Sequence, residues 1–310
     1  MDAVFQWLTP GVSDAAHRTD VLFFSLLAIT AAVAAAIFAV VVVFAIRYRA
    51  SSTVDRSAPP AQNLPLELAW LAALLVSFLS FFAWAAYDYR DLYRAPADAM
   101  PVYVVAKQWM WKLQHANGRR EIDELHVPVG QAVRVVMTSQ DAIHSFYVPA
   151  LRLKQDVVPG RYTSIWFRAT RAGEYHLLCA EYCGTQHAAM RGRIVVMEPA
   201  AFARWLEAGP HEPGLAQRGF ELFRQYGCSG CHSTRSAVHA PELAGLFGRT
   251  VHLADGRSLV ADEAYLRDSI LLPKKDVVAG FEPIMPSFAG QIGEEDIQAI
   301  VHYIRSTRRE

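Results

Sequence analysis

The chain has 310 residues, a length typical of about two domains. Its 30 basic and 30 acidic residues balance, so the composition gives no electrostatic support for a nucleic-acid partner and we expect none. The four cysteines, Cys179, Cys183, Cys228 and Cys231, are too few for a disulfide scaffold, and their close pairing points to metal ligation or cofactor attachment.

Two apolar runs lie near the N-terminus, at residues 21–46 and 66–88. As a helix the first would be roughly 39 Å long, more than the ~30 Å hydrocarbon core of a bilayer, and the second also suffices to span it. The first run is too long for a cleaved signal peptide and lacks a basic segment before it. We therefore predict a two-helix transmembrane hairpin within residues 1–98.

The charges beside these runs predict an orientation. The connecting loop carries Arg47, Arg49 and Arg56 against a single acid, Asp55. The positive-inside rule then places the loop in the cytoplasm and both termini outside. In a bacterium this corresponds to an inner-membrane protein, in contact with lipid, whose remaining domains lie in the periplasm.

Residues 99–200 show a different pattern, with short β-rich runs separated by glycines. Many short strands with turn signals predict an all-β sandwich or barrel. The clearest runs are residues 102–106, 132–138, 163–168 and 193–197.

A group of soft metal ligands falls within this β-rich region. Cys179 and Cys183 are followed by His187 and Met190, and His144 lies upstream in a loop. Thiolate, imidazole and thioether together select copper, and the second thiolate makes room for a second copper ion. A disulfide between the two cysteines is the alternative in an oxidising compartment. A zinc site fits less well, because zinc rarely recruits a thioether.

Three segments, residues 141–149, 154–160 and 179–190, resemble cytochrome c oxidase subunit II. The resemblance implies a cupredoxin-like barrel with a binuclear copper centre, CuA, in which both cysteines bridge two copper ions. One copper also takes a His and the Met, and the other takes a His and a backbone carbonyl. The ligands implied here are His144, Cys179, Glu181, Cys183, His187 and Met190.

The same resemblance implies three further roles. The Glu181 carboxylate would contact a Mg²⁺ shared with subunit I. Trp109, in an aromatic stretch, would be the residue through which electrons enter, although it could simply fill a core. Glu67 would lie at the entrance of a proton path. The equally weighted alternative is an acid at the membrane interface that simply contacts water.

After a predicted linker at residues 201–213, residues 214–310 resemble an all-α class I cytochrome c domain. Cys228, Cys231 and His232 form the C-x-x-C-H signature of covalent haem c, in which two thioethers hold the haem and the His binds its iron. Met285 is the expected second axial ligand, since a Met/His pair is typical of cytochromes c. The alternative axial ligands are His239, His252 and His302.

The resemblance implies a proton-translocating cytochrome c oxidase, with O₂ reduced to water in subunit I and subunit III as a further partner. An external cytochrome c or another respiratory complex would donate electrons to the haem domain. The balanced charge of this domain is compatible with a tethered electron carrier, whose local concentration does not depend on electrostatic steering. Two alternatives remain. One is the copper subunit of a nitric oxide reductase, and the other is a membrane-anchored redox sensor or metal carrier.

Overall fold

The computed structural model describes residues 10–55, 57, 62–208, 213–233, 236 and 238–307. Arg56, which contributes to the predicted orientation, and residues 209–212 of the predicted linker lie outside the described residues. The chain forms two compact units, one of residues 14–94 and one that contains residues 95–310.

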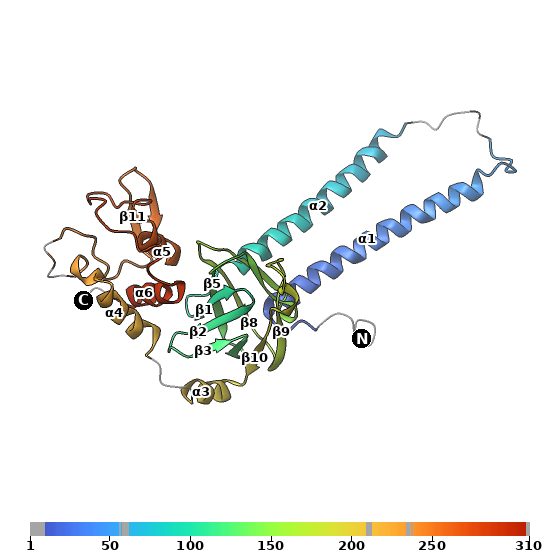
Figure 1. The fold of residues 1–310 in the computed structure, drawn as a ribbon. Helices are drawn as coiled ribbons and strands as arrows, with labels where there is room; N and C mark the ends of the chain where they lie inside the picture. The colour runs from blue at the N-terminus through green and yellow to red at the C-terminus, as the bar shows by residue number, and fades with distance from the viewer. Residues whose placement is uncertain are drawn as a thin grey trace. The chain divides into compact units, whose positions relative to one another are not determined.

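The first unit is a pair of long helices, α1 (Asp14–Arg47) and α2 (Leu64–Leu92), which run side by side (Figure 1). α1 begins ahead of the apolar run, with Asp14 in its first turn, and Arg47 lies in its last turn. Both charges suit the helix dipole. The Asn63 side chain caps α2 by accepting a hydrogen bond from the Leu66 N–H at 3.2 Å.

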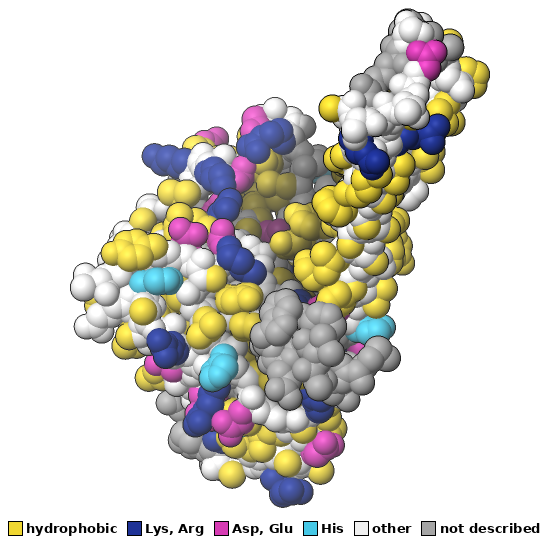
Figure 2. Space-filling model, turned by 90° about the vertical axis from the view of Figure 1, so that its right-hand side faces the viewer, with side chains coloured by type: hydrophobic (Ala, Val, Ile, Leu, Met, Phe, Trp, Pro, Cys, Tyr) yellow, Lys and Arg dark blue, Asp and Glu magenta, His cyan; other side chains and the backbone are white. Residues whose placement is uncertain are grey.

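The hairpin exposes large apolar side chains along both helices, and those on the face drawn in Figure 2 appear yellow. Among the described residues of the two helices, Ala16 alone has a buried side chain. A helix that is hydrophobic all round needs an apolar environment. Both helices are long and apolar enough to cross a membrane, which fits a membrane-anchored chain.

The second unit begins with a sandwich of two five-stranded sheets. In spatial order the first sheet holds β3 (Arg120–Ile122), β2 (Met110–His115), β1 (Met100–Lys107), β5 (Ala132–Ser139) and β8 (Thr163–Arg168). The second holds β4 (Glu124–Pro128), β10 (Arg191–Met197), β9 (Gly173–Cys179), β6 (His144–Val148) and β7 (Leu153–Val157). β1–β5 and β4–β10 pair in parallel, and the other pairs are antiparallel.

The sandwich core comes from one face of each sheet. Val102, Val104 and Trp111 are fully buried, and Trp111 packs its ring 5.5 Å from that of Phe146 in the second sheet. Alternate residues point to opposite faces of a strand. Tyr103, between Val102 and Val104, therefore lies on the outer face of the first sheet. The predicted all-β domain is confirmed, and each of the four predicted runs lies within a strand.

A short helix, α3 (Pro199–Glu207), stands where the predicted linker was to begin at residue 201. Trp205 stacks on His126 with ring centroids 4.2 Å apart, and the guanidinium of Arg119 lies 3.7 Å from the Trp205 ring. Phe202 is buried on the same side. The linker prediction was therefore wrong for this stretch, which forms a short amphipathic helix that packs on the sandwich. The prediction relied on the prolines and glycines that follow this helix in the sequence.

The last region is helical, with α4 (Leu215–Gln225), α5 (Glu263–Leu271), α6 (Glu294–Ser306) and a two-stranded hairpin of β11 (Thr250–His252) and β12 (Ser258–Val260). α4 and α6 cross in close contact at Gly219. A Cβ there would lie 2.0 Å from the Ala299 carbonyl oxygen, so this position admits only glycine. The predicted cytochrome-like helical domain is confirmed.

Candidate metal and haem centres

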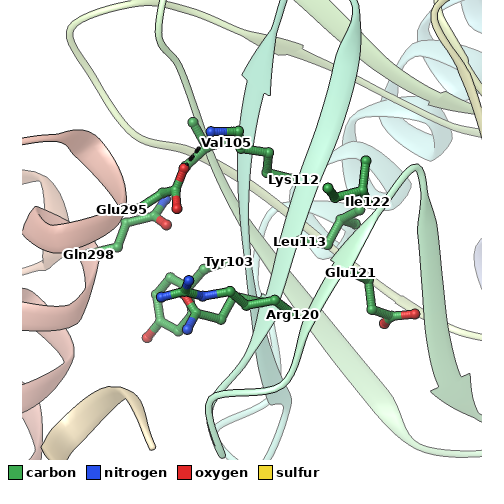
Figure 3. A pocket seen from close by; sticks show the side chains of 10 residues that line it. Tyr103, Val105, Lys112, Leu113, Arg120, Glu121, Ile122, Glu295 and Gln298 are labelled. Carbon is green, nitrogen blue, oxygen red and sulfur yellow. Dashed lines mark hydrogen bonds and ion pairs between the residues drawn. The ribbon is translucent and has the colours of Figure 1, made fainter. Parts of the chain in front are cut away.

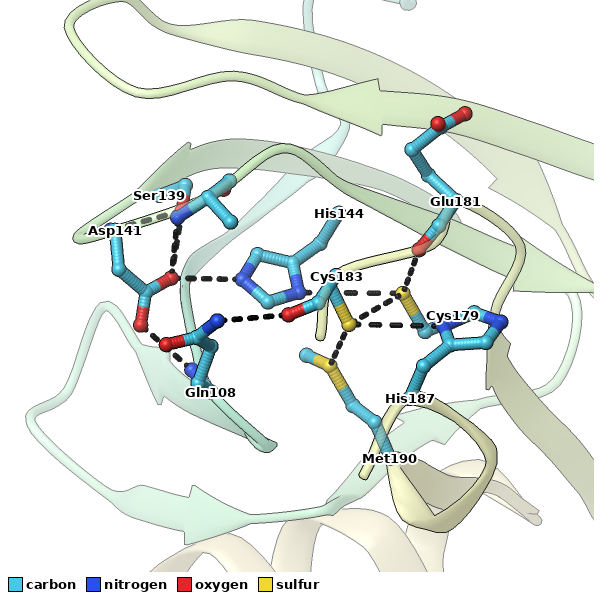
Figure 4. Close-up of polar contacts among 10 residues, drawn as sticks. Gln108, Ser139, Asp141, His144, Cys179, Glu181, Cys183, His187 and Met190 are labelled. Carbon is cyan, nitrogen blue, oxygen red and sulfur yellow. Dashed lines mark hydrogen bonds and ion pairs between the residues drawn. The ribbon is translucent and has the colours of Figure 1, made fainter. Parts of the chain in front are cut away.

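The soft ligands predicted from the sequence converge at one end of the sandwich (Figure 4). Cys179 ends β9, Cys183 lies in the following loop, and their sulfur atoms are 3.7 Å apart. Nδ1 of His144 lies 3.9 Å from the Cys179 sulfur, and Nδ1 of His187 lies 3.6 Å from the Cys183 sulfur. A disulfide would need about 2.05 Å between the sulfurs, so both thiols are free.

Two further donors complete the group. The Met190 thioether lies 3.9 Å from the Cys183 sulfur, and the backbone carbonyl of Glu181 lies 3.2 Å from the Cys179 sulfur. Met190 and both cysteines are buried. The carboxylate of Glu181 points away from the sulfur atoms into solvent, so this residue faces the cluster through its backbone only (Figure 4).

The two thiols differ in acidity. Burial raises the pKa of both, but at Cys179 hydrogen-bond contacts with His144 and with backbone groups outweigh burial and lower the pKa to about 6. At Cys183 burial and the neighbouring Cys179 sulfur act together and raise the pKa. The pair therefore forms one thiolate readily, and a bound cation would be needed to hold both as thiolates.

A second layer of contacts orients this cluster. Nε2 of His144 lies 2.8 Å from the carboxylate of Asp141, which also accepts a hydrogen bond from the Gln108 N–H at 2.7 Å. The Gln108 side chain donates to the Cys183 carbonyl at 2.7 Å. A carboxylate behind a ligand histidine fixes which nitrogen faces the metal. Sequence reasoning gave no role to Asp141 or Gln108, although an Asp three residues before a ligand His was a usable signal.

The haem-attachment signature lies at the mouth of an apolar cavity in the helical domain. Cys228 begins a short 3₁₀ turn (Cys228–Gly230) after α4 and Cys231 follows it, and both line a cavity of about 240 Å³ together with His232 and Met285. The rest of the lining is mainly apolar, from α4, α5, α6 and the segments between them. Nδ1 of His232 lies 3.0 Å from the Pro241 carbonyl oxygen, which leaves the other ring nitrogen for iron. Two thiols, an imidazole and a thioether around an apolar cavity fit a covalent haem.

The alternative axial histidines are placed differently. His302 makes a hydrogen-bond contact of 2.9 Å with the Tyr103 hydroxyl, outside the cavity. His252 contacts Ser258 across the β11–β12 hairpin at 2.8 Å. His239 lines the cavity and stacks on Phe281 with ring centroids 4.6 Å apart.

Both regions match known families. Residues 81–198 match the family described as cytochrome C oxidase subunit II, periplasmic domain, and residues 216–308 match the family described as cytochrome c. Cytochrome c oxidase subunit 2 of Alkalihalophilus pseudofirmus is 28% identical over 90% of this chain and 84% of its own length. The chain joins a domain of the cytochrome c oxidase subunit II family to a domain of the cytochrome c family.

Other relatives carry the same or a related name. Cytochrome c oxidase subunit 2 of Thermostichus vulcanus is 29% identical over 66% of this chain and 81% of its own length. Alternative cytochrome c oxidase subunit 2 of Bradyrhizobium diazoefficiens is 33% identical over 42% of this chain and 58% of its own length. The solved periplasmic domain of subunit II of cytochrome oxidase from Bradyrhizobium japonicum is 31% identical, covers 37% of this chain and 95% of that structure, and has a TM-score of 0.36.

Membership makes this chain a subunit of a haem–copper oxidase, an oxidoreductase complex, with a role in electron transfer. The subunit II family implies the CuA copper centre, and the cytochrome c domain implies haem c. His144, Cys179 and Cys183 form a group able to hold a metal ion, with donor atoms all within 4.8 Å of one another. The residues of both centres thus fit the groups that the two families bind.

The two tryptophans of the subunit II aromatic stretch have different surroundings. Trp111 is fully buried, as a core residue would be. Trp109 is half-buried in the loop between β1 and β2, and its ring lies against Gly184, next to Cys183, where an added Cβ would come within 3.1 Å of it. Trp109 therefore lies against the loop that carries Cys183, whereas the Trp111 ring packs against that of His144 with centroids 6.2 Å apart.

Glu67 lies in the first turn of α2 and is exposed. Its backbone N–H donates to the Asn63 carbonyl at 3.0 Å, so the residue belongs to the helix from its start. The position agrees with an acid at the end of a membrane-spanning helix. Its part in a proton path stays a prediction.

Proposed function

We propose that this chain is the subunit through which electrons enter a proton-translocating cytochrome c oxidase of a bacterial inner membrane. In this proposal both termini and the two cofactor domains lie in the periplasm. The cytochrome c domain accepts electrons from an external cytochrome c or another respiratory complex, and the cupredoxin-like domain passes them to subunit I, where O₂ becomes water. Subunit III would complete the assembly.

The observation that carries the proposal is the arrangement of four further donors around two thiols 3.7 Å apart. We propose Cys179 and Cys183 as the bridging ligands of two copper ions. His144, His187, Met190 and the Glu181 carbonyl would supply the terminal ligands, with one imidazole on each copper. A ligand set of thiolates, imidazoles and a weak thioether is typical of copper sites that transfer single electrons.

In the helical domain, we propose that Cys228 and Cys231 hold the haem through thioether bonds, with His232 and Met285 as axial ligands. A Met/His pair sets a high haem potential, as in cytochromes c. The chain's own contribution is to bury the haem in the cavity between α4, α5 and α6 and to fix the His232 ring through its contact with Pro241.

Three finer assignments belong to the same proposal. Trp109, which lies against the copper-ligand loop, would be the residue through which electrons reach the centre. The exposed Glu181 carboxylate would meet a Mg²⁺ at the contact with subunit I. Glu67 would begin the proton path from the cytoplasmic end of α2.

The test is the copper and haem content of the purified complex, with its optical and EPR spectra. We expect two copper ions and one covalent haem c per chain. His187→Ala should reduce copper content, whereas His176→Ala, which changes an exposed histidine on β9 outside the ligand group, should not. Cyanide-sensitive oxygen consumption should accompany the native complex. Covalent haem without paired copper would refute the proposed copper centre.

A further inference from the structure

The core of the haem domain does not end at its own helices. Tyr103 on β1 and Val136 on β5 are each 1% exposed and belong to the same buried cluster as the apolar residues of α4, α5 and α6. Both face outward from the first sheet of the sandwich. The Tyr103 hydroxyl lies 2.9 Å from Nδ1 of His302 on α6. Moving the haem domain away would therefore expose apolar surface on both sides of the contact.

Charged groups are buried in the same contact, and each is paired. Glu263 on α5, with a side chain 5% exposed, accepts two hydrogen bonds from Arg134 on β5 at 2.8 and 3.2 Å and one from Arg305 on α6 at 3.2 Å. Arg267, with a side chain 3% exposed, donates to the Gly160 carbonyl of the sandwich and pairs with Glu294 on α6. Separation of the domains would leave some of these groups without partners.

The rim of the contact carries a more accessible ion pair. Nζ of Lys112 on β2 lies 2.7 Å from the Glu295 carboxylate on α6, and each side chain is 31% exposed. The pair borders a cavity of about 240 Å³ that Tyr103 and Gln298 also line (Figure 3). A carboxylate and an amine in such contact can be joined by a single amide bond.

Helix α6 presents different faces to its two neighbours. Glu295, Gln298 and His302 point to the sandwich, and Ile300 and Ile304 line the haem cavity. These are the two sides of one helix by its 3.6-residue period. The contact with the sandwich therefore leaves Ile284, which also lines the haem cavity, 64% exposed.

From these contacts we infer that the haem domain is held in one docked position on the outer face of the first sheet and donates electrons from there. It does not act as a carrier that swings on the linker after α3. The inference rests on the proposed electron transfer between the two domains. Its partner surface is this chain's own sandwich, through Tyr103, Arg134, Val136 and Lys112, and the external donor meets a haem domain that is already in place.

The experiment joins the domains covalently. The purified complex is treated with a water-soluble carbodiimide, which forms amides between touching amines and carboxylates, and its peptides are analysed by mass spectrometry. We expect a Lys112–Glu295 amide, together with a Lys275–Asp268 amide inside the haem domain as the reagent control, because that pair lies 2.5 Å apart. Glu295→Gln should remove only the first. A Lys275–Asp268 amide without the Lys112–Glu295 amide would overturn the docked position.

The second readout is the rate at which the reduced haem domain reduces the copper domain, followed by stopped-flow absorption. In the cross-linked complex we expect this rate to stay within about twofold of that in Glu295→Gln treated with the same reagent. A rate at least tenfold lower would mean that the domain must move, and would overturn the inference. If no transfer occurs even before treatment, the proposed function fails, and the cross-link still reports whether the domains dock.

Discussion

The crossing of α4 and α6 allows a quantitative prediction for Gly219→Ala. The new Cβ would lie 2.0 Å from the Ala299 carbonyl oxygen and 2.7 Å from the Tyr303 Cβ. An ordinary carbon–oxygen contact is about 3.3–3.6 Å, so the helices would have to separate by more than about 1 Å. Neither obstacle can rotate aside, because the carbonyl is backbone and a Cβ is fixed to its own backbone.

Two effects of opposite sign set the magnitude. Alanine is favoured over glycine inside a helix by about 1 kcal/mol. Overpacking costs about 1–3 kcal/mol, and a gap of 0.5–1 Å already forfeits a quarter to a half of each van der Waals contact along the interface. Against a backbone obstacle we take the upper end, about 3 kcal/mol. The net expected loss of stability is therefore about 2 kcal/mol.

Hydrogen exchange of the α4 and α6 amides, measured by mass spectrometry on the full complex, reports this loss locally. A loss of about 2 kcal/mol corresponds to roughly 30-fold faster exchange. Gly293→Ala is the matched control, because a Cβ at the start of α6 meets nothing within 4 Å. If Gly219→Ala exchanges no faster than this control, the two helices do not cross as closely as described, and the argument is wrong.

Three other predictions follow. Glu121, held between His115 and His126, has a lowered pKa because hydrogen bonds from these histidines outweigh its burial. The ionised Glu121 therefore stabilises the fold at pH values above its ordinary pKa of about 4.3, and this stabilisation is lost as the pH falls through the lower pKa of the folded state. The urea midpoints of wild type and Glu121→Gln should accordingly differ at pH 7 and converge in acid. Trp111→Ala should lower the free energy of unfolding in urea by about 3–5 kcal/mol, because removal of its fully buried ring leaves a cavity. Trp109→Phe should instead slow copper reduction in stopped flow with little loss of stability. Equal effects of the two variants on unfolding would contradict this division. Met285→Ala should lower the haem potential in a redox titration, whereas His239→Ala should leave it unchanged, and the reverse result would reassign the axial ligand.

Signals that are local in the sequence predicted much of this molecule. The two apolar runs form α1 and α2, because a helix is the structure in which an uninterrupted apolar stretch of that length can satisfy its own backbone hydrogen bonds. The ligands from Cys179 to Met190 also meet in space, because they lie within one short loop and the turn that follows it. The cysteine pair beside His232 lies in a single turn for the same reason.

Other features required the tertiary structure. The stacking of Trp205 on His126 was not predicted, because it depends on where α3 packs on a strand distant in the sequence. The predicted linker likewise proved to begin with a helix, whose apolar face is explained only by the sheet it covers.

The sequence by itself therefore predicted the two long apolar helices, the two domain types and the residues that gather at the two candidate sites, since hydrophobic period and cysteine spacing are properties of short segments. Only the tertiary structure decided what surrounds them. His302, an alternative haem ligand by composition, instead contacts Tyr103 on the opposite domain. Arg134 and Glu263, to which the sequence assigned no role, form a part-buried ion pair there. Such contacts join residues far apart in the chain, and no local pattern encodes them.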